Sequence, residues 1–551
     1  MTKKMMVHRM KPRMNKSRPK PKQSSHAAGQ SRRDTDYEQL VAGAPPSFKS
    51  FHLNEPNLVF ANGQTSVDVK EGLTLFGPAN PDGKNSRTIR VAAIGTGEGI
   101  DSLKSYLETA RQKITPGLNS RKKPYDPICF PDFPGANSAA SFRANFVTEP
   151  AIQRIIPEEY FAKAVASANV STKLKQVVEL IVAKLKTLAD CEPEPDVVVI
   201  VLPPCVEKEC ATIGAAFRNQ RVVLSPMQKM VKKLEKQRQF TGQELLQLDF
   251  SDPVIQATGY WNLHHAVKAH AMATGLTTQF AWQTTLNGDG LTQDPASAAW
   301  NFFTALYYKS NNIPWQLASV PQNTCFVGVT FYKESPLKGA DTQSSLAQVF
   351  SGHGEGLVLK GEKALLDKKR DRKPHLNEAG AQQLLSKALG LYQQMHGIKP
   401  ARVVIHKTSR YWPEELQGFK KALGDIPSHD FLALDRLGIR FMRVGQKPPL
   451  RGTVITLAPR KHIIYTTGFV PQLGDYPGMR VPVPLQIVEH HGESSVETLA
   501  REILALTKVN WNSCAFCNGD PITIQFARSV GHILTELPKG VEPQTKYKFY
   551  M

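Results

Sequence analysis

The chain has 551 residues, with 69 Lys and Arg against 48 Asp and Glu, so its net charge is +21. Hydrophobic residues make up 41% and charged residues 21%, which excludes a wholly disordered chain, and the length exceeds what one hydrophobic core usually fills. No apolar run reaches the ~18 residues that a membrane helix requires. A positive charge of this size favours polyanionic partners, with nucleic acid first.

The first 45 residues form a basic tail. Residues 1–25 contain nine Lys or Arg and no acid, and the prolines and the serines that follow oppose helix formation. We expect residues 1–45 to be disordered, either contacting phosphates or only aiding solubility. Because these nine charges are a minority of the excess, the remainder of the chain is predicted to be basic as well.

Residues 46–150 are rich in Pro, Gly and Asn and predict a segment with few helices, and we assign residues 46–165 to this lead-in. Residues 158–188 then carry apolar positions at helical spacing, and residues 197–202 are all apolar and mostly β-branched. A helix followed by such a strand is typical of a parallel α/β unit. Two more α/β stretches follow, at residues 263–282 and 296–317.

From residue 325 onward the pattern changes to several strands with two helices. We predict strands at residues 326–332, 356–359, 403–405, 441–444, 454–457 and 462–466, and helices near residues 378–396 and 415–423. This order predicts a mixed sheet covered by helices. The expected fold class is therefore α/β throughout.

Seven cysteines are scattered along the chain, an odd number that does not suggest a disulfide framework and fits a reducing cytoplasm. Cys514 and Cys517 form one C-x-x-C, but structural zinc needs two further ligands at suitable spacing. We assign no metal site to this pair.

A candidate phosphate site emerges between residues 262 and 315. His264 and Lys268 are four residues apart and would share one face of a helix, while Gln279 follows at the start of the next strand and Lys309 ends a later helix. Two lysines, an amide and an imidazole could together bind a phosphate. Spacing alone is weak evidence, since His and Lys at this distance are usually a surface pair.

These four positions resemble the MID domain of Argonaute proteins. In that family an aromatic or His residue, a Lys four residues later, a Gln and a further Lys anchor the phosphorylated 5′ end of a guide strand. The resemblance implies that His264, Lys268, Gln279 and Lys309 bind the guide 5′-phosphate, with His264 stacking on the first base. It also makes Mg²⁺ a candidate ion at this phosphate.

The resemblance continues into the PIWI domain, which has an RNase H-like fold, and spans roughly residues 260–535. The similar segments are residues 325–331, 404–409, 451–453, 476–480, 506–513 and 521–524. The implied organisation is a lead-in at 46–165, a Rossmann-like MID domain at 166–320 and a PIWI domain at 321–551. This order is similar to that of short prokaryotic Argonautes, with no room before residue 150 for the N-terminal and PAZ domains of long ones.

PIWI nucleases cut with carboxylates that hold two Mg²⁺ ions. The corresponding positions here hold Thr330, Thr408 and Arg528, and a hydroxyl or a guanidinium cannot replace a carboxylate as a ligand of a hard cation. We therefore expect no catalytic residues and no certain metal site. Glu355 and Glu362 lie where a fourth acid could fall, but they are interpreted as loop glutamates.

Three functions remain to be compared. The first is a catalytically inactive subunit that binds a small guide, RNA rather than DNA, recognises complementary single-stranded DNA in prokaryotic defence, and activates a partner. The resemblance implies that this partner carries an APAZ domain with a TIR, sirtuin-like or nuclease effector, forming a heterodimer that could oligomerise. The alternatives are a guided nuclease with a rearranged metal site and a non-guided nucleic-acid-binding protein.

Overall fold

The computed structural model describes the chain from residue 48 onward with internal gaps. The described ranges are 48–79, 87–118, 125–167, 170–210, 262–289, 293–318, 320–321, 323–333, 343–350, 356–367, 370–371, 373–441, 445, 448–476, 478, 481–525, 527–538 and 540–551. The predicted tail at 1–45 and Glu355 lie outside these ranges, as does most of the strand predicted at 441–444. Residues 50–551 form one compact unit.

The first half of this unit is built on a parallel sheet with the strand order β5-β4-β7-β8, in which β6 also pairs with β4. Its strands are β4 (Arg87–Gly95), β5 (Ala144–Val147), β6 (Gln153–Ile155), β7 (Val197–Leu202) and β8 (Thr278–Trp282). Its helices are α3 (Gly97–Thr109), α4 (Glu158–Val165), α5 (Val170–Ala189), α6 (Pro204–Cys210), α10 (Leu263–Ala271), α11 (Gln283–Leu286) and α12 (Pro295–Lys309).

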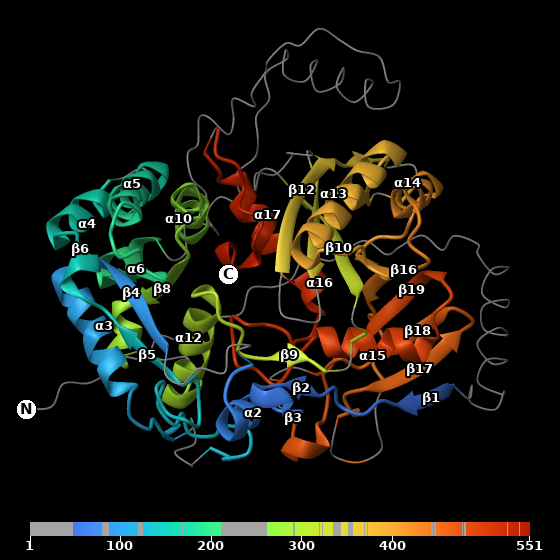
Figure 1. The fold of residues 1–551 in the computed structure, drawn as a ribbon, viewed down its shortest axis with the longest axis horizontal. Helices are drawn as coiled ribbons and strands as arrows, with labels where there is room; N and C mark the ends of the chain where they lie inside the picture. The colour runs from blue at the N-terminus through green and yellow to red at the C-terminus, as the bar shows by residue number, and fades with distance from the viewer. Residues whose placement is uncertain are drawn as a thin grey trace, which may run out of the picture. The chain divides into compact units, whose positions relative to one another are not determined.

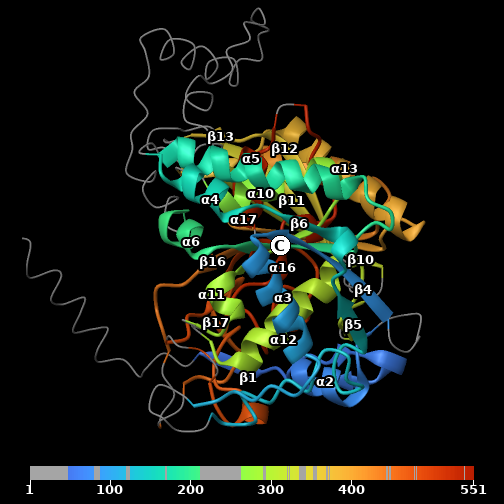
Figure 2. The same cartoon turned by 90° about the vertical axis from the view of Figure 1, so that its left-hand side faces the viewer.

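Strand β7 is an unbroken apolar run because both of its faces are buried. Val197, Val199 and Val201 pack in the cluster that contains α3 and α12. Val198 and Ile200 pack on the other face, in the cluster with α4, α5 and α10. Figure 2 shows α5 with α10 and α3 with α12 on opposite sides of β4 and β6. A parallel strand covered on both faces has no position for a polar side chain.

The first sheet extends across the domain boundary predicted at residue 166. β4 and β5, within the expected lead-in at 46–165, belong to the same parallel sheet as β7 and β8. Val91 pairs with Val197, so the sheet begins some eighty residues before the predicted boundary. The sequence indicates an extended piece at residues 88–94, but not its pairing with β7, because composition and local pattern do not report long-range pairing.

The second half is built on a nine-stranded mixed sheet with the order β1-β17-β18-β19-β16-β15-β10-β11-β12. Its strands are β1 (Lys49–His52), β10 (Thr324–Lys333), β11 (Gln343–Phe350), β12 (Gly356–Lys363), β15 (Arg402–Lys407), β16 (Ser428–Arg436), β17 (Thr453–Ala458), β18 (Lys461–Ile464) and β19 (Leu485–Gly492). Strands β10, β15 and β16 are parallel, so their carboxyl ends lie along the same edge.

Helices cover both faces of the central strands. α13 (Glu378–His396) and α14 (Pro413–Leu423) pack on one face, while α15 (Val496–Leu506) and α17 (Ala527–Thr535) share a hydrophobic cluster with the other. Figure 1 shows this half in yellow to red, apart from the blue edge strand β1, and the first sheet in blue to green. The remaining elements are α2 (Val69–Phe76), α16 (Ile522–Gln525) and the short strands β2 (Leu58–Val59), β3 (Thr65–Ser66), β9 (Gln316–Leu317), β13 (Leu365–Leu366) and β14 (Pro374–His375).

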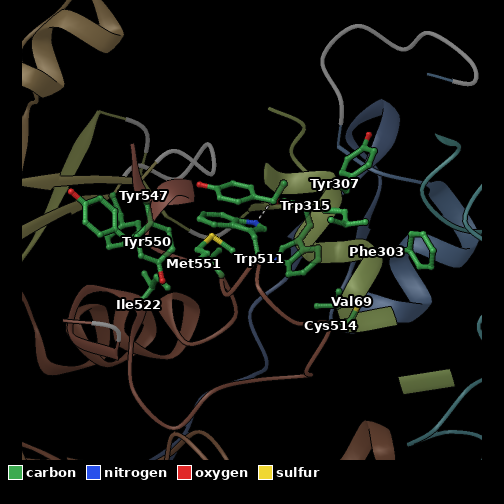
Figure 3. Packing of buried hydrophobic residues seen from close by; sticks show 14 of the residues in the cluster. Val69, Phe303, Tyr307, Trp315, Trp511, Cys514, Ile522, Tyr547, Tyr550 and Met551 are labelled. Atoms are coloured by element: carbon green, nitrogen blue, oxygen red, sulfur yellow. Dashed lines mark hydrogen bonds between the residues drawn. The ribbon is translucent and has the colours of Figure 1, made fainter. Parts of the chain in front are cut away.

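One continuous hydrophobic core joins the two halves. Trp315 and Trp511 are fully buried there, and each indole nitrogen donates to a backbone oxygen of the other segment: Trp315 Nε1 to Lys508 O at 3.0 Å and Trp511 Nε1 to Trp315 O at 3.1 Å. Trp511 also stacks on Tyr308, with centroids 4.9 Å apart. Figure 3 shows both indoles side by side with Met551 nearby.

Among the described residues, none of the helices combines the length and the apolar character that crossing a membrane requires. All seven cysteines lie in this part of the chain and are free thiols.

Candidate functional site

Helix α10 is placed by its cap and by the turn that follows it. The Asn262 side chain accepts from the backbone N–H of His265 at 3.1 Å, which fixes the start of the helix. The chain then reverses at Gly275, whose φ of +71° suits glycine, and enters β8. This reversal brings Lys268 against the first residue of β8, where its Nζ donates to Thr278 O at 3.0 Å.

Helix α12 delivers the second lysine to the same place. Asp294 caps the helix and Pro295 occupies its first position, so the helix is well defined from its start to Lys309. The Nζ of Lys309 donates to Oε1 of Gln279 on β8, and Thr277 Oγ1 donates to the Lys309 backbone oxygen at 3.2 Å. Three of the four predicted phosphate ligands therefore meet at the start of β8.

The electrostatics of this pocket are unusual because both lysines are only 1% exposed. Within the described residues neither contacts a carboxylate. Burial lowers the pKa of Lys268 to about 7. Burial and the nearby charge of Lys268 lower the pKa of Lys309 well below its ordinary value. Two buried ammonium groups without a counter-charge are costly unless an anion supplies one.

His264 lies on α10, four residues before Lys268, and is exposed. Its ring is 4.8 Å from that of Phe280, the residue after Gln279, at an angle of 49°. The surrounding protein lowers its pKa, and Lys268, His265 and Lys309 lower it further, so the ring is neutral at pH 7. A neutral exposed ring beside the pocket can offer a stacking surface rather than a charge.

The described residues of the pocket fit an anion better than they fit Mg²⁺. They contribute two lysine amines and no side-chain carboxylate, the ligand type that Mg²⁺ favours. The one amide oxygen present, Gln279 Oε1, already accepts from Lys309. The lysines can neutralise a phosphate directly, so we derive no role for Mg²⁺ here.

Two of the positions expected to correspond to nuclease ligands, Thr330 and Thr408, lie on neighbouring parts of the second sheet. Val329 on β10 pairs in parallel register with Lys407, the last residue of β15, so Thr330 is the next residue of β10 and Thr408 directly follows β15. Thr330 is buried and its Oγ1 has no hydrogen-bond partner in the described part of the chain, whereas Thr408 is exposed.

The structure also describes two further positions that we considered for nuclease ligands. Arg528 falls in the first turn of α17, and Glu362 is exposed on β12. Among the described residues, no group of three or more His, Cys, Asp or Glu is arranged to hold a metal ion.

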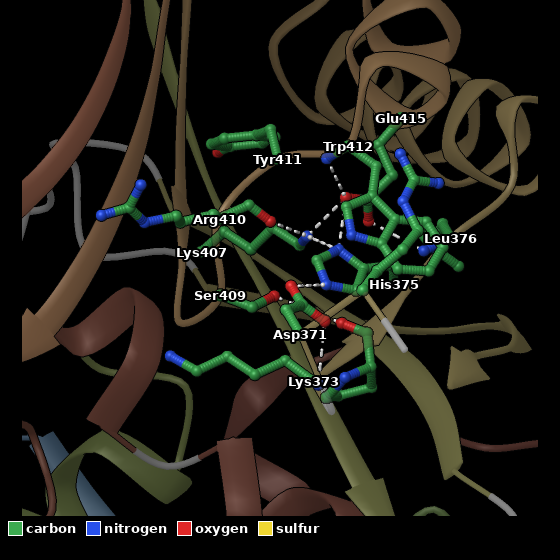
Figure 4. A network of polar contacts seen from close by, with 12 residues as sticks. Asp371, Lys373, His375, Leu376, Lys407, Ser409, Arg410, Tyr411, Trp412 and Glu415 are labelled. Carbon is green, nitrogen blue, oxygen red and sulfur yellow. Dashed lines mark hydrogen bonds and ion pairs between the residues drawn. The ribbon is translucent and has the colours of Figure 1, made fainter. Parts of the chain in front are cut away.

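A buried ionic network beside Thr408 was not predicted from the sequence (Figure 4). Lys407 Nζ lies 2.7 Å from a Glu415 carboxylate oxygen, which also lies 2.9 Å from His375 Nδ1, and all three side chains are fully buried. Asp371 completes the chain of contacts at 2.7 Å from His375 Nε2. The feature of the sequence that could have indicated this network is Lys407, a lysine at the end of a largely apolar strand.

This network fixes the loop after β15. Burial raises the pKa of Glu415, but contacts with His375 and Lys407 outweigh burial and lower it overall. The carboxylate also accepts from the backbone N–H groups of Trp412 and Leu376, at 3.0 and 2.8 Å. It thereby holds α14 and β14 against the end of β15.

The geometry defines a mixed α/β protein with two buried lysines beside its first sheet and a nine-stranded mixed second sheet. No protein-family profile matches the chain. Over 242 residues it is 22% identical to the Argonaute protein of Aquifex aeolicus, an alignment that covers 43% of this chain and 31% of that protein.

Solved structures show the same fold. The Argonaute of Clostridium butyricum, bound to a guide DNA and a 19-mer target DNA, aligns with a TM-score of 0.57 and 16% identity over 90% of this chain and 54% of that one. Aa-Ago with externally bound siRNA aligns with a TM-score of 0.50 and 15% identity, covering 91% and 56%. The chain thus spans about a third to a half of the proteins it matches.

These likenesses confirm the predicted fold class: the chain has an Argonaute-like fold, with a MID part followed by a PIWI part. The chain is thus similar in sequence and in fold to Argonaute proteins.

Proposed function

We propose that this protein is the guide-binding subunit of a prokaryotic defence system. It binds a 5′-phosphorylated small guide strand, RNA rather than DNA, and recognises complementary single-stranded DNA in the cytoplasm. The observation that carries this proposal is the meeting of Lys268, Lys309 and Gln279 in a buried pocket without a described carboxylate. Phosphate contacts supply affinity, and base pairing supplies sequence choice.

The PIWI part of this protein is proposed to be catalytically inactive. The support for this is that Thr330 and Thr408 follow the paired residues Val329 and Lys407 and occupy positions where the resemblance leads us to expect metal-binding carboxylates, and a hydroxyl does not replace one as a ligand of a hard cation. Arg528 at a third position would add repulsion.

Effector chemistry then resides in a second protein. We propose an APAZ-containing partner with a TIR, sirtuin-like or nuclease module, joined to this chain as a heterodimer of the short prokaryotic Argonaute type. Identifying the protein and sequencing the nucleic acid that purify with the full chain tests this part. Nucleic acid without a defined length would instead favour a non-guided binding protein.

The pocket assignment is tested by guide binding. Lys268→Ala and Lys309→Ala are expected to weaken binding of a 5′-phosphorylated guide by at least ~10-fold, because each removes a charge-assisted contact, and to affect a 5′-hydroxyl guide far less. Lys175→Ala is the matched control, because Lys175 is exposed on α5. Equal loss for both guides would refute the assignment.

A further inference from the structure

A second cationic pocket lies in the PIWI part and plays no role in the function proposed above. It is a cavity of about 260 Å³ lined by Lys420, His429, Arg460, His490, His491 and Gly492. These residues come from α14, β16, the turn between β17 and β18, and the end of β19. Four elements distant in sequence therefore converge on one polar cavity without an acidic residue in its lining.

This pocket is at the opposite end of the sheet from Thr330 and Thr408. His429 pairs with Val403, which pairs with Cys325 at the beginning of β10. Thr330 lies five residues further along β10, or ~16 Å at 3.3 Å per residue. Strands β16 and β19, which carry the three histidines, lie side by side in Figure 1. The pocket is therefore separate from the edge where nuclease ligands would stand.

Two of the three imidazoles are held in place by carboxylates behind them. His490 Nε2 lies 2.7 Å from Asp430 Oδ1, and Asp430 is fully buried and also bonded to Arg402 and Ser494. His491 Nε2 lies 2.6 Å from Glu489 Oε1. In each ring the second nitrogen, Nδ1, has no partner in the described part of the chain.

Gly492 allows the backbone of β19 to approach the Asp430 carboxylate that holds His490. A Cβ at this position would lie 2.3 Å from Asp430 Oδ1, the atom that holds His490. Only a residue without a side chain lets β19 approach the carboxylate and keep the His490 contact. The orientation of His490 is thus fixed by packing as well as by its hydrogen bond.

The two permanent cations have no carboxylate partner. Lys420 and Arg460 form no ion pair within the described residues, while Lys421, adjacent to Lys420, pairs with Glu378. The three histidines are not arranged to hold a metal ion, and the two cations would repel one. The chemistry of the lining therefore favours an anion over a cation.

We infer that this pocket binds a phosphate group, either inorganic phosphate or the phosphate of a small phosphomonoester. A tetrahedral oxyanion offers several oxygens to donors that come from different directions, as the Lys420 ammonium and the Arg460 guanidinium fork do here, whereas a carboxylate offers two. The cavity is polar and smaller than the ~300–1,000 Å³ typical of organic ligand pockets, so a phosphate group fits it better than a large apolar ligand.

Isothermal titration of the full chain tests this inference with two probes, inorganic phosphate and adenosine monophosphate. The test variant is Lys420→Ala/Arg460→Ala. The matched control is Lys421→Ala/Lys461→Ala, which removes the same charge from adjacent exposed positions outside the lining. We expect the test variant to weaken binding by at least ~10-fold and the control to leave it within about twofold.

The guide pocket could also bind these probes, so the titration is repeated in Lys268→Ala/Lys309→Ala. Binding that persists in this background and disappears when Lys420→Ala/Arg460→Ala is added supports the inference, whatever the fate of the proposed guide function. Tighter binding of adenosine monophosphate than of phosphate would assign a phosphomonoester, and the reverse would assign the free ion. Absence of binding in that background, or equal weakening by the test and control variants, would overturn it.

Discussion

The ring of His265 on α10 stacks on the ring of His532 on α17, with centroids 5.7 Å apart and planes within 9° of parallel. A second contact lies close by: the backbone N–H of Asn262, the cap of α10, donates to Oε1 of Glu536, the residue directly after α17, at 3.1 Å. α10 carries Lys268 of the candidate guide pocket, and α17 packs on β10, the strand of Thr330. Helix α17 thus connects α10, which carries Lys268, to the second sheet.

The first prediction is an acid-sensitive contact between these helices. Burial, His532 and Lys268 lower the pKa of His265 to about 4. Because the unfolded chain binds this proton near pH 6.5 and the folded chain only near pH 4, stability should fall as the pH decreases through that window. His265→Phe, which keeps an aromatic ring but cannot titrate, should flatten the pH dependence of the apparent Tm. An unchanged slope would contradict the prediction.

The second prediction concerns proton uptake on guide binding. With its pKa lowered to about 7, Lys268 is largely neutral at pH 8, and a bound phosphate would favour its charged form. Affinity for a 5′-phosphorylated guide should therefore fall as the pH rises above 7. Calorimetry at pH 8 in buffers of different ionisation enthalpy should show proton uptake that decreases in Lys268→Met. The same uptake with a 5′-hydroxyl guide would argue against the pocket.

The third prediction tests the buried network at the end of β15. Glu415→Ala leaves Lys407 buried without its counter-charge and should lower the free energy of unfolding by about 3–5 kcal/mol, measured by urea denaturation. Lys407→Met/Glu415→Leu should cost less than the single change. Glu414→Ala is the control: its side chain is 52% exposed, so its pair with Arg370 contributes at most ~1 kcal/mol. Equal losses at positions 414 and 415 would be inconsistent with this account.

The fourth prediction is the absence of guide-directed cutting. Purified protein incubated with a 5′-phosphorylated guide, a complementary target and Mg²⁺ or Mn²⁺ should bind the target and leave it intact, because Thr330 and Thr408 supply no carboxylate. Gel analysis of the labelled target measures this. A product whose position follows the guide would favour the alternative of a nuclease with a rearranged metal site.

Several elements were predictable because their neighbours in sequence determine them. α13 (Glu378–His396) has the bounds expected from its apolar spacing, and β7 (Val197–Leu202) is buried on both faces, as its composition requires. β16 and β19 were missed, since both contain His, Asp or Glu. Their polar residues are tolerated through partners distant in sequence, as Asp430 is by Arg402 and His490.

The sequence by itself determined the order of His264, Lys268, Gln279 and Lys309 and the residue types at positions 330, 408 and 528, since these are read directly from the chain. Only the tertiary structure decided that β4 and β5 complete the first sheet and that Lys268 and Lys309 are buried beside Gln279. The physical reason is that burial and the absence of a described counter-charge depend on which elements pack together. That packing is a long-range property, which local spacing does not encode.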